Sequence, residues 1–527
     1  MDVRPYCLHD FSMKLGFSLL LMFYLVRSCL GESLTISMEQ LSGDGIWISP
    51  LPKKIKDKTE PLQVTVWFDK QFLGDGEGYQ RRAAEFSEEG RLDLRKAVIQ
   101  ALKKQSEESF SQAEEELERL SDKGILSGLE RHWIVNGFSC LMKYEDLLSL
   151  AQVPGVRKVF LPFLKQRPLN ELPESELEVS KAPPLKEPSF ENLPWYISQL
   201  KADRVWKEFG VTGQGTLNVI HDKNFIISEH LARNVYRNPK EIPNNEVDDD
   251  GNGYVDDHFG YNFDRKSADL YTKAFQGDPK EKGLLHGSNC ANIVSGAGDG
   301  QGSAQCGVAP LSRWAGVING GGIEHSVEWA IEQGADTYSM SFSRRDYGEY
   351  RSHWRKVMEH GNFCGLFFVS GAGNIARNDE FPFLMNIPQS IPNAVFAAAG
   401  VQKDLSKTEF SCVGPVEWEL EHYQDGVVQK PEVCAFNAGV DGQLPDGTML
   451  ENSLNGNSYA GPMFCGTIAL MLSAEPDLLP WDLKEIITTT ATDVGPEGID
   501  HETGHGLINC YKAVEEVLRR KQLRAAR

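Results

Sequence analysis

Residues 455–472 read NGNSYAGPMFCGTIALML, a short run of small and polar residues followed by a long apolar run. The apolar part predicts a buried helix, and Ser458 stands at its start. A serine in that position is a common N-cap, because its hydroxyl accepts a hydrogen bond from a free backbone N–H group. The same position also presents a hydroxyl at the positive end of a helix dipole, where it can do chemistry. The stretch alone favours capping, so the remaining sequence has to decide between the two interpretations.

The second half of the chain predicts an α/β unit. Short apolar runs alternate with helical patterns, and the clearest runs are TLNVI (216–220), LFFVSGA (366–372) and AVFAAAG (394–400). Such alternation is typical of a mostly parallel sheet covered by helices. Parallel sheets usually carry their functional groups at the carboxyl ends of the strands.

Three further polar residues stand at the edges of apolar elements. Asp222 follows the first run, His286 lies in GLLHGSNCANIVSG (283–296), and Asn374 ends FFVSGAGN (367–374). Each alone has an ordinary explanation, as a turn former, a structural histidine or a turn asparagine. The four residues follow one another in the order Asp, His, Asn, Ser. That order, with each residue beside an apolar element, favours a functional constellation.

These segments resemble the subtilisin-like serine proteases (subtilases, peptidase family S8) over most of residues 194–515. The resemblance lies in Gly456-x-Ser458-x-Ala460-x-Pro462, in His286-Gly287-Ser288, in Gly371-Ala372-Gly373-Asn374 and in the strand before Asp222. It implies an α/β, subtilisin-like three-layer fold with a mostly parallel central sheet.

The resemblance also implies a mechanism. Ser458 is expected to attack a peptide bond and form an acyl-enzyme, His286 to carry its proton, and Asp222 to hold the histidine. Asn374 is expected to donate a hydrogen bond to the oxyanion. The partner is then a protein or peptide substrate, which adds as an extended strand beside Ser341, Gly371 and Gly373.

The sequence departs from the family pattern around Asp222. Lys223-Asn224 follow it where the family has small residues, and counting back from Leu231 would put His221 in the acid's place. We prefer Asp222, because the strand upstream fixes the register better than the loop downstream. The departure leaves a second hypothesis open, a catalytically inactive relative that binds peptides or has a structural role. An α/β-hydrolase esterase is disfavoured, since that fold orders its triad Ser, Asp, His.

Residues 32–165 predict a separate small domain. Strands are expected at LQVTVWF (62–68) and VRKVFLP (156–162), a helix at 91–104, and either two strands around Asn136-Gly137 or one bent strand over 132–143. The order β-α-β-β-α-β predicts a ferredoxin-like α+β sandwich. Residues 135–160 resemble the end of an inhibitor I9-type propeptide. The chain is then expected to be a zymogen with its own propeptide as an intramolecular inhibitor.

Segments outside these two domains bear on processing and location. Residues 1–31 read as a signal peptide and predict a secreted or otherwise extracytoplasmic protein, in a periplasm or at a cell surface. Residues 166–194 form a proline-rich linker before the catalytic domain at 195–527, and self-cleavage is expected between Phe163 and Pro194. No later run predicts a membrane span. The net charge of −21 argues against a nucleic-acid partner.

The stretch DDDGNGYVDD (248–257) predicts a structural calcium site. It resembles the first half of an EF-hand loop, although Phe259 stands where the last glutamate would be. Calcium also fits the resemblance, and a solvated acidic hairpin is the alternative. No HExxH or paired CxxC motif indicates a zinc enzyme. The expected ligands are Asp248, Asp250, Asn252, the Tyr254 carbonyl and Asp256.

Cysteine placement leaves the pairing open. Eight of the ten cysteines follow the signal region, and Cys364, Cys434 and Cys465 lie in apolar runs that favour buried free thiols. Two pairs remain open as disulfides, Cys290 with Cys306 and Cys412 with Cys434.

Overall fold

The structure is a computed structural model of the 527-residue chain. It describes residues 34–53, 55, 59–162, 193–223, 225–227, 229–270, 285–298, 306–376, 385–443 and 449–526. The expected signal peptide and nearly all of the expected linker lie outside these residues. The domain boundaries and the cleavage segment therefore stay predictions.

One seven-stranded sheet organises the second half of the chain, in the order β16-β13-β12-β11-β8-β10-β9. Every pairing in it is parallel, which confirms the predicted sheet type. Its central strands are fully buried and rich in Val, Ile, Phe and Ala, as a sheet covered on both faces requires. The strands are β8 (Leu217–His221), β9 (Gly260–Asn262), β10 (Arg313–Ile318), β11 (Thr337–Met340), β12 (Phe367–Gly371), β13 (Val395–Val401) and β16 (Val433–Phe436).

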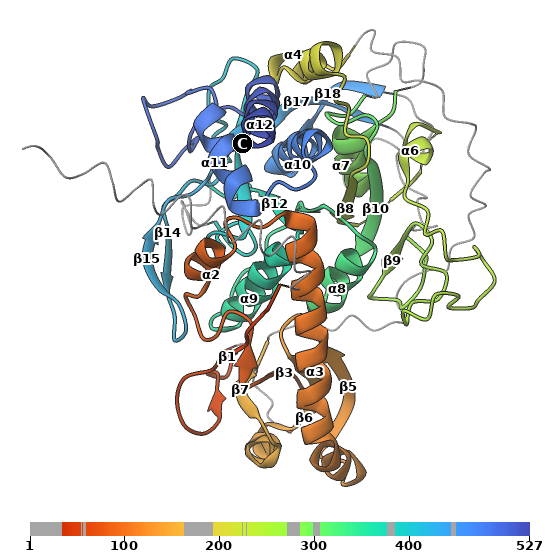
Figure 1. Cartoon of the computed structure of the whole chain (residues 1–527), viewed down its shortest axis with the longest axis vertical. Coiled ribbons are helices and arrows are strands. Elements are labelled where there is room, and N and C mark those ends of the chain that lie inside the picture. Colours follow the sequence, from red (N-terminus) through yellow and green to blue (C-terminus); the bar gives the residue numbers. More distant parts are fainter. Residues whose placement is uncertain are drawn as a thin grey trace, which may run out of the picture.

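Helices cover both faces of this sheet and give the three-layer fold (Figure 1). Helices α7 (His286–Ser295) and α10 (Asn457–Ala474) pack together on one face, and α8 (Glu324–Glu332) and α9 (Tyr350–Phe363) pack together on the other. The remaining helical segments are α4 (Trp195–Gln199), α5 (Ala202–Arg204), the π-helical turn Val205–Phe209, α6 (Glu229–Asn234), α11 (Pro480–Thr490) and α12 (Cys510–Ala525). Two antiparallel hairpins flank the sheet, β14–β15 (Val416–Glu419, Gln424–Val428) and β17–β18 (Ala438–Gln443, Met449–Asn455).

Helix α10 begins two residues earlier than the capping interpretation of Ser458 requires. Its N-cap is Gly456, and Ser458 is the second helical residue, so that interpretation is wrong. Gly456 has φ +146°, a conformation that side-chain-bearing residues rarely adopt, and its carbonyl accepts from Tyr459 N. Gly456 therefore occupies the N-cap position, and the Ser458 hydroxyl does not cap the helix.

The N-terminal domain has a five-stranded sheet in the order β2-β7-β3-β6-β5. Its last four strands form the antiparallel ferredoxin-like order that the sequence predicts. The strands around Asn136-Gly137 are two, not one bent strand. The elements are β1 (Glu39–Gln40), β2 (Trp47–Ile48), β3 (Leu62–Phe68), β4 (Lys70–Gln71), α2 (Tyr79–Glu85), α3 (Arg91–Asp122), β5 (Leu126–His132), β6 (Gly137–Met142), the 3-10 segment Tyr144–Gln152 and β7 (Val156–Phe160).

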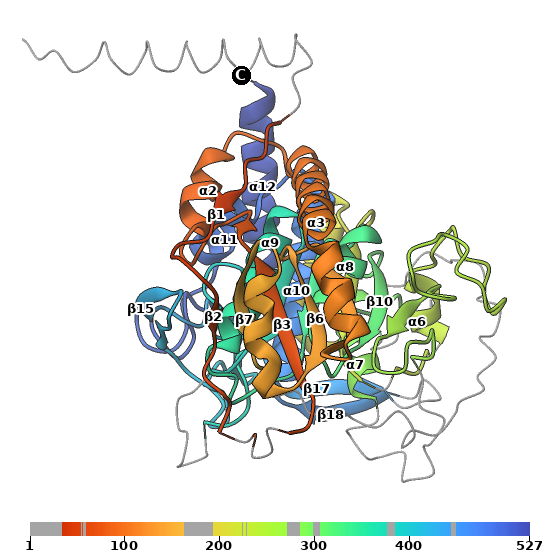
Figure 2. The same cartoon turned by 90° about the horizontal axis from the view of Figure 1, so that it is seen from below.

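The N-terminal domain packs on α8 and α9, through α3 and β5 (Figures 1 and 2). One apolar cluster runs through both domains and includes Trp67, Phe72 and Tyr79 of the first with Phe363 and Trp481 of the second. A second cluster, between the far half of α3 and its own sheet, belongs to the N-terminal domain alone. The contact between the domains therefore has the character of a protein core.

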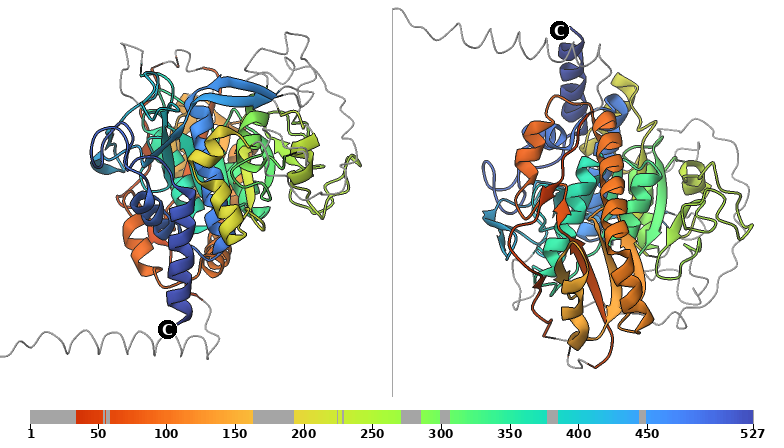
Figure 3. Two further views of the ribbon diagram at one scale, coloured as in Figure 1. Left: turned by 90° about the horizontal axis from the view of Figure 1, so that it is seen from above. Right: turned by 60° about the horizontal axis from the view of Figure 1, so that its bottom comes forward.

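Within the described residues, no helix has both the length and the apolar character needed to cross a membrane. The most prominent projecting helix is α12, which extends from the body at the C-terminal end (Figure 3).

All eight cysteines beyond the expected signal region are free and buried. The two pairings left open by the sequence, Cys290 with Cys306 and Cys412 with Cys434, are therefore not disulfides in this structure. Burial raises the pKa of these thiols, for example that of Cys364 to about 12. They behave as small apolar side chains in the core.

Candidate active site

Asp222 and His286 form a close pair at the carboxyl edge of the sheet. Asp222 follows β8, and His286 is the first residue of α7. The Nδ1 atom of His286 lies 2.8 Å from both carboxylate oxygens of Asp222. The Asp222 side chain is 5% exposed and that of His286 18%, so the pair is shielded from water but open at one end. This geometry fixes the histidine ring and leaves Nε2 as its second functional nitrogen.

His221, the alternative for the acid's place, has a different environment. Its Nδ1 contacts Tyr338 Oη at 3.0 Å, and its Nε2 contacts Asn319 O at 2.8 Å. Burial lowers the pKa of His221 to about 4, so the ring is neutral. His221 is a core residue beneath the sheet edge, and the carboxylate that meets His286 is that of Asp222.

The charge of Asp222 changes the proton affinity of His286. Burial opposes the charged form of the ring, but the Asp222 carboxylate, by its charge and its hydrogen bond, raises the pKa of His286 well above its usual value. The pair is therefore strongly polarised, and the imidazolium form is stabilised.

The first turn of α10 brings Ser458 to the same edge. Pro462 lies inside the helix and has no N–H group to donate to the carbonyl of Ser458, four residues earlier. That carbonyl instead accepts hydrogen bonds from Ser341 Oγ at 2.9 Å and from Cys290 Sγ at 3.4 Å. Ser341 follows β11, and Cys290 lies one turn along α7 from His286. The proline thus frees a carbonyl that ties the serine's turn to two other elements.

The hydroxyl of Ser458 faces Ser341 in this structure. Its Oγ donates to the carbonyl of Ser341 at 3.4 Å, a long hydrogen bond. Among the described residues it makes no hydrogen bond to His286. The neighbouring Tyr459 ring has its centroid 5.7 Å from that of His286, so the start of α10 lies beside the histidine.

Asn374 lies over the start of α10. Its Oδ1 accepts from the backbone N–H of Asn457 at 2.7 Å. Asn457 in turn donates from Nδ2 to Gly373 O at 2.5 Å and to Ser411 Oγ at 3.0 Å, and accepts from Asn437 at 2.7 Å. These bonds hold the start of the helix against the segment after β12 that carries Asn374. No local pattern in the sequence indicated that Asn457, Asn437 and Ser411 would meet here.

The two glycines expected beside a substrate have structural reasons to be small. A Cβ at Gly371 would lie 2.0 Å from the carbonyl oxygen of Asn457, so helix α10 could not pack there. Gly373 has φ +106°, a conformation that favours glycine. Ser341, the third expected residue, lies at the same edge and contacts Ser458 directly. The structure therefore brings Asp222 to His286, and Ser341, Gly371 and Asn374 to the first turn of α10.

Comparison with known proteins identifies the family. The model of the subtilase family matches residues 216–506, more than half of the chain. The chain belongs to the subtilase family. It is 24% identical over 454 residues to bacillopeptidase F of Bacillus subtilis, covering 80% of this chain and 29% of that protein. It is 27% identical over 348 residues to a probable subtilase-type serine protease of Deinococcus radiodurans, covering 62% and 44%.

A further relative is a calcium-dependent protease of Nostoc, 25% identical over 275 residues, covering 44% of this chain and 40% of that protein. The matches span less than half the length of these three relatives.

In the acidic loop of this subtilase, two of the expected ligands lie together with a third carboxylate that was not expected. Asp248 and Asp250 lie together with Glu241, with ligand oxygens within 4.8 Å of one another. Glu241 was missed, because it precedes the motif by seven residues. Its Oε2 is buried and has no hydrogen-bond partner among the described residues, and burial raises its pKa. An unpaired buried carboxylate oxygen beside two other carboxylates fits a divalent cation.

The other expected ligands of the loop have local roles. The Asp256 carboxylate accepts from the backbone N–H groups of Asn245 and Glu246, at 3.1 and 3.0 Å. Asn252 accepts from Tyr254 N at 2.8 Å and donates to the buried Asp257 at 2.9 Å. These bonds shape the loop, and Asp256 is not part of the group around Glu241.

Proposed function

We propose that this chain is a serine endopeptidase that hydrolyses peptide bonds through Asp222, His286 and Ser458. The observation that carries the proposal is the contact of His286 Nδ1 with both oxygens of Asp222, 2.8 Å away, at the edge where Ser458 lies in the first turn of helix α10. This pairing leaves His286 Nε2 to act on the serine. The family match and the named relatives support the same reaction class.

In the proposed mechanism His286 acts as general base and then as general acid. The Ser458 hydroxyl turns from Ser341 O toward Nε2, transfers its proton to the ring and attacks the substrate carbonyl. Asp222 accepts from Nδ1–H, keeps the ring in the required tautomer and stabilises the imidazolium. His286 then protonates the leaving amine, and water hydrolyses the acyl-enzyme by the same steps in reverse.

The oxyanion would be held between Asn374 and the first N–H groups of α10. The helix dipole adds positive potential there, and the bonds of Asn457 keep the two elements in register. Ser341 and Gly373 border the groove in which the substrate strand would lie.

The proposal includes synthesis as an exported zymogen. The N-terminal domain resembles an inhibitory propeptide, and its last strand β7 ends at Phe160, just before the segment expected to be cleaved. The expected signal peptide supports export to a secreted, periplasmic or cell-surface location. In Ser458→Ala the chain should keep its full length on a gel, whereas the parent chain shortens. Equal shortening of both would refute self-cleavage.

Calcium is the proposed structural cofactor. Glu241, Asp248 and Asp250 would hold it, and the ion would neutralise three crowded carboxylates and order the loop between α6 and β9. The Nostoc relative, named a calcium-dependent protease, supports this assignment.

One observation favours the alternative of an inactive peptide-binding relative, namely the hydrogen bond from Ser458 to Ser341 O instead of to His286. Labelling with a fluorophosphonate decides between the two, because only an activated serine reacts quickly. We expect rapid labelling of the processed protein and none in Ser458→Ala. Ser473→Ala is a matched control on the same helix, where the hydroxyl donates to Gln214 O, and should label like the parent. Equally slow labelling of all three proteins would establish the inactive alternative.

A further inference from the structure

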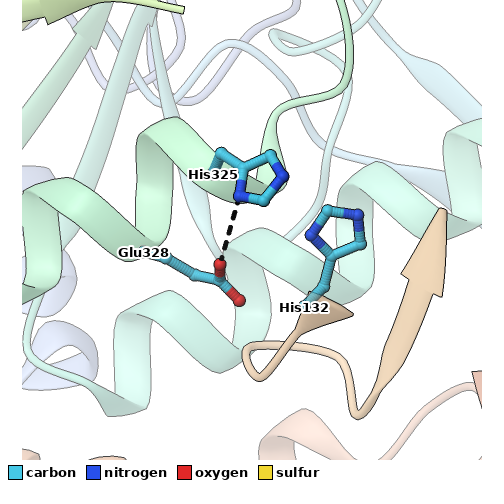
Figure 4. A group of neighbouring side chains, drawn as sticks. All are labelled: His132, His325 and Glu328. Carbon is cyan, nitrogen blue, oxygen red and sulfur yellow. Dashed lines mark ion pairs between the residues drawn. The ribbon is translucent and has the colours of Figure 1, made fainter. Parts of the chain in front are cut away.

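Three side chains with metal-ligand chemistry meet where the N-terminal domain contacts the catalytic domain. His132 is the last residue of β5, while His325 and Glu328 lie one turn apart on α8. Their ligand atoms all lie within 4.8 Å of one another. Figure 4 shows the histidine and glutamate of the helix facing the histidine of the strand across a common space. Helix α8 covers the face of the sheet opposite α7 and α10, so this group is separate from the catalytic pair.

The outer nitrogen of each histidine is held by a neighbour. His132 Nε2 contacts Ser139 Oγ at 2.9 Å, and His325 Nε2 contacts Glu130 Oε2 at 3.3 Å. This leaves the Nδ1 atom of each ring for the common space. Metal-binding histidines are usually oriented in this way, by a hydrogen bond from the nitrogen that does not bind the ion.

The ligand atoms that face the common space form no hydrogen bonds with one another. His132 Nδ1 is buried and has no hydrogen-bond partner among the described residues. His325 Nδ1 lies 3.8 Å from Glu328 Oε2, too far for a hydrogen bond. The other oxygen of Glu328 accepts from Ile134 N at 2.9 Å, which fixes the carboxylate. A buried polar atom without a partner is costly, and an ion bound between the three atoms would satisfy all of them.

We propose that His132, His325 and Glu328 bind one zinc ion that fastens the N-terminal domain to the catalytic domain. Two imidazoles and one carboxylate are a ligand set that zinc takes with a fourth position left for water. Calcium is disfavoured, because it prefers oxygen ligands. Zinc–nitrogen bonds of about 2.0–2.1 Å place tetrahedral ligand atoms roughly 3.4 Å apart, so the three ligand atoms must draw together when the ion binds. The His325 side chain is 31% exposed and provides the route by which the ion enters.

The ion would act on the assembly of the two domains. His132 comes from one domain and the other two ligands come from the second, so the complete site exists only while the domains are docked. An ion that binds only the docked state stabilises that state in proportion to its concentration and affinity.

The test uses the whole chain carrying Ser458→Ala, so that the two domains stay covalently linked. ZnCl₂ is titrated by calorimetry, with calcium in excess to occupy the acidic loop. We expect one zinc per chain and a rise in Tm on addition of zinc. His132→Gln and His325→Gln should each weaken zinc binding by more than about tenfold, and Glu130→Gln should weaken it by about 10- to 100-fold, since Glu130 orients His325.

His501→Gln is the matched control, a histidine in an exposed loop outside the group, and should bind zinc like the parent. Far-UV circular dichroism without metal checks that each variant is folded. If the buried His132→Gln does not fold, the partly exposed His325→Gln decides alone. The proposal is overturned if the parent binds no zinc. It is equally overturned if His325→Gln binds zinc with the parent's affinity, which would place the ion elsewhere, for instance at His286.

Discussion

Arg91, at the start of α3, forms a buried ion pair with Asp336, the residue before β11, with 2.8 Å between Nη2 and Oδ1. The Arg91 guanidinium also donates to the carbonyls of Gly365 and Pro476, and the second oxygen of Asp336 accepts from Leu217 N. This arginine of the N-terminal domain therefore contacts groups of the catalytic domain at the edge of its sheet. The Arg91 guanidinium also lies over the ring of Phe367, a member of the apolar cluster shared by the two domains, 5.8 Å from its centroid.

Replacing Arg91 should strongly destabilise the protein. Arg91→Ala leaves Asp336 buried without its partner, and loss of one member of a buried pair costs about 3–5 kcal/mol of the free energy of unfolding. Denaturant unfolding of the Ser458→Ala chain measures the change. Arg204→Ala is the control, because it removes an exposed pair with Glu208 that water screens, and its effect on stability should be small. Equal effects of the two substitutions would show that the domain contact contributes little to stability.

The N-terminal fragment should stay bound after cleavage. Besides Arg91, buried Lys356 donates to the carbonyls of Gly74 and Gly76, at 3.1 and 3.2 Å, and Trp67 Nε1 donates to His353 Nδ1 at 2.8 Å. Separation would expose all of these groups and the shared apolar core. We expect both fragments to elute together in gel filtration of the processed protein, and to separate only under denaturing conditions. Free catalytic domain under native conditions would contradict this.

Asn374 should be needed for turnover beyond its role at the start of α10. In subtilisin, loss of the oxyanion-hole asparagine lowers turnover by about a hundred- to a thousand-fold. We expect a similar fall in kcat for Asn374→Ala and for Asn374→Asp, with little change in KM. Asn374→Asp is the informative variant, because it keeps the oxygen that accepts from Asn457 N but removes the amide donor. If Asn374→Asp kept its activity and Asn374→Ala lost it, the enzyme would need only the oxygen that accepts from Asn457 N. Asn374 would then act only by capping helix α10.

Calcium should stabilise the protein through the group around Glu241. We expect added CaCl₂ to raise the Tm of the parent, and Glu241→Gln or Asp250→Asn to remove most of that rise, because each takes away a charged ligand. Asp256→Asn is the matched control, since its carboxylate binds backbone N–H groups of the same loop. It should lower the Tm slightly and keep the response to calcium. If only Asp256→Asn lost the rise in Tm on addition of calcium, the ion would be bound by the ligand set expected from the sequence and not by the group around Glu241.

Local patterns predicted the strands and the order of the functional residues, and the structure agrees because these features depend on short-range periodicity. The helix at 91–104 was placed correctly but ended too early. Phe110, Ala113, Leu117 and Leu120 continue its apolar face at helical spacing through Asp122, among many charged residues. That signal was present in the sequence, and the high charge of the segment obscured it.

Other features depend on contacts that no local pattern carries. Glu241 joins Asp248 only because the loop folds back, and Asp256 turns to cap a neighbouring turn instead. His132 meets His325 only because two domains dock, with 192 residues between them in the chain. The sequence contains the ligands in each case, but their grouping is a property of tertiary structure.

The activity should rise with pH. His286 must be neutral to accept the proton of Ser458, and the Asp222 carboxylate, against the opposing effect of burial, raises the pKa of His286 well above the usual value of about 6.5. The kcat/KM for a peptide substrate should therefore increase as pH rises through that raised pKa, with a midpoint above about 6.5. The contribution of His286 to the free energy of unfolding should instead fall as pH rises. A group whose pKa is raised by folding contributes stability that is fully present below its unfolded pKa and is lost as pH rises through its folded pKa. In the inactive Ser458→Ala background, His286→Gln should then cost most stability in acid and least at alkaline pH. An activity that is flat across this range, or highest in acid, would show that Asp222 does not control the proton of His286.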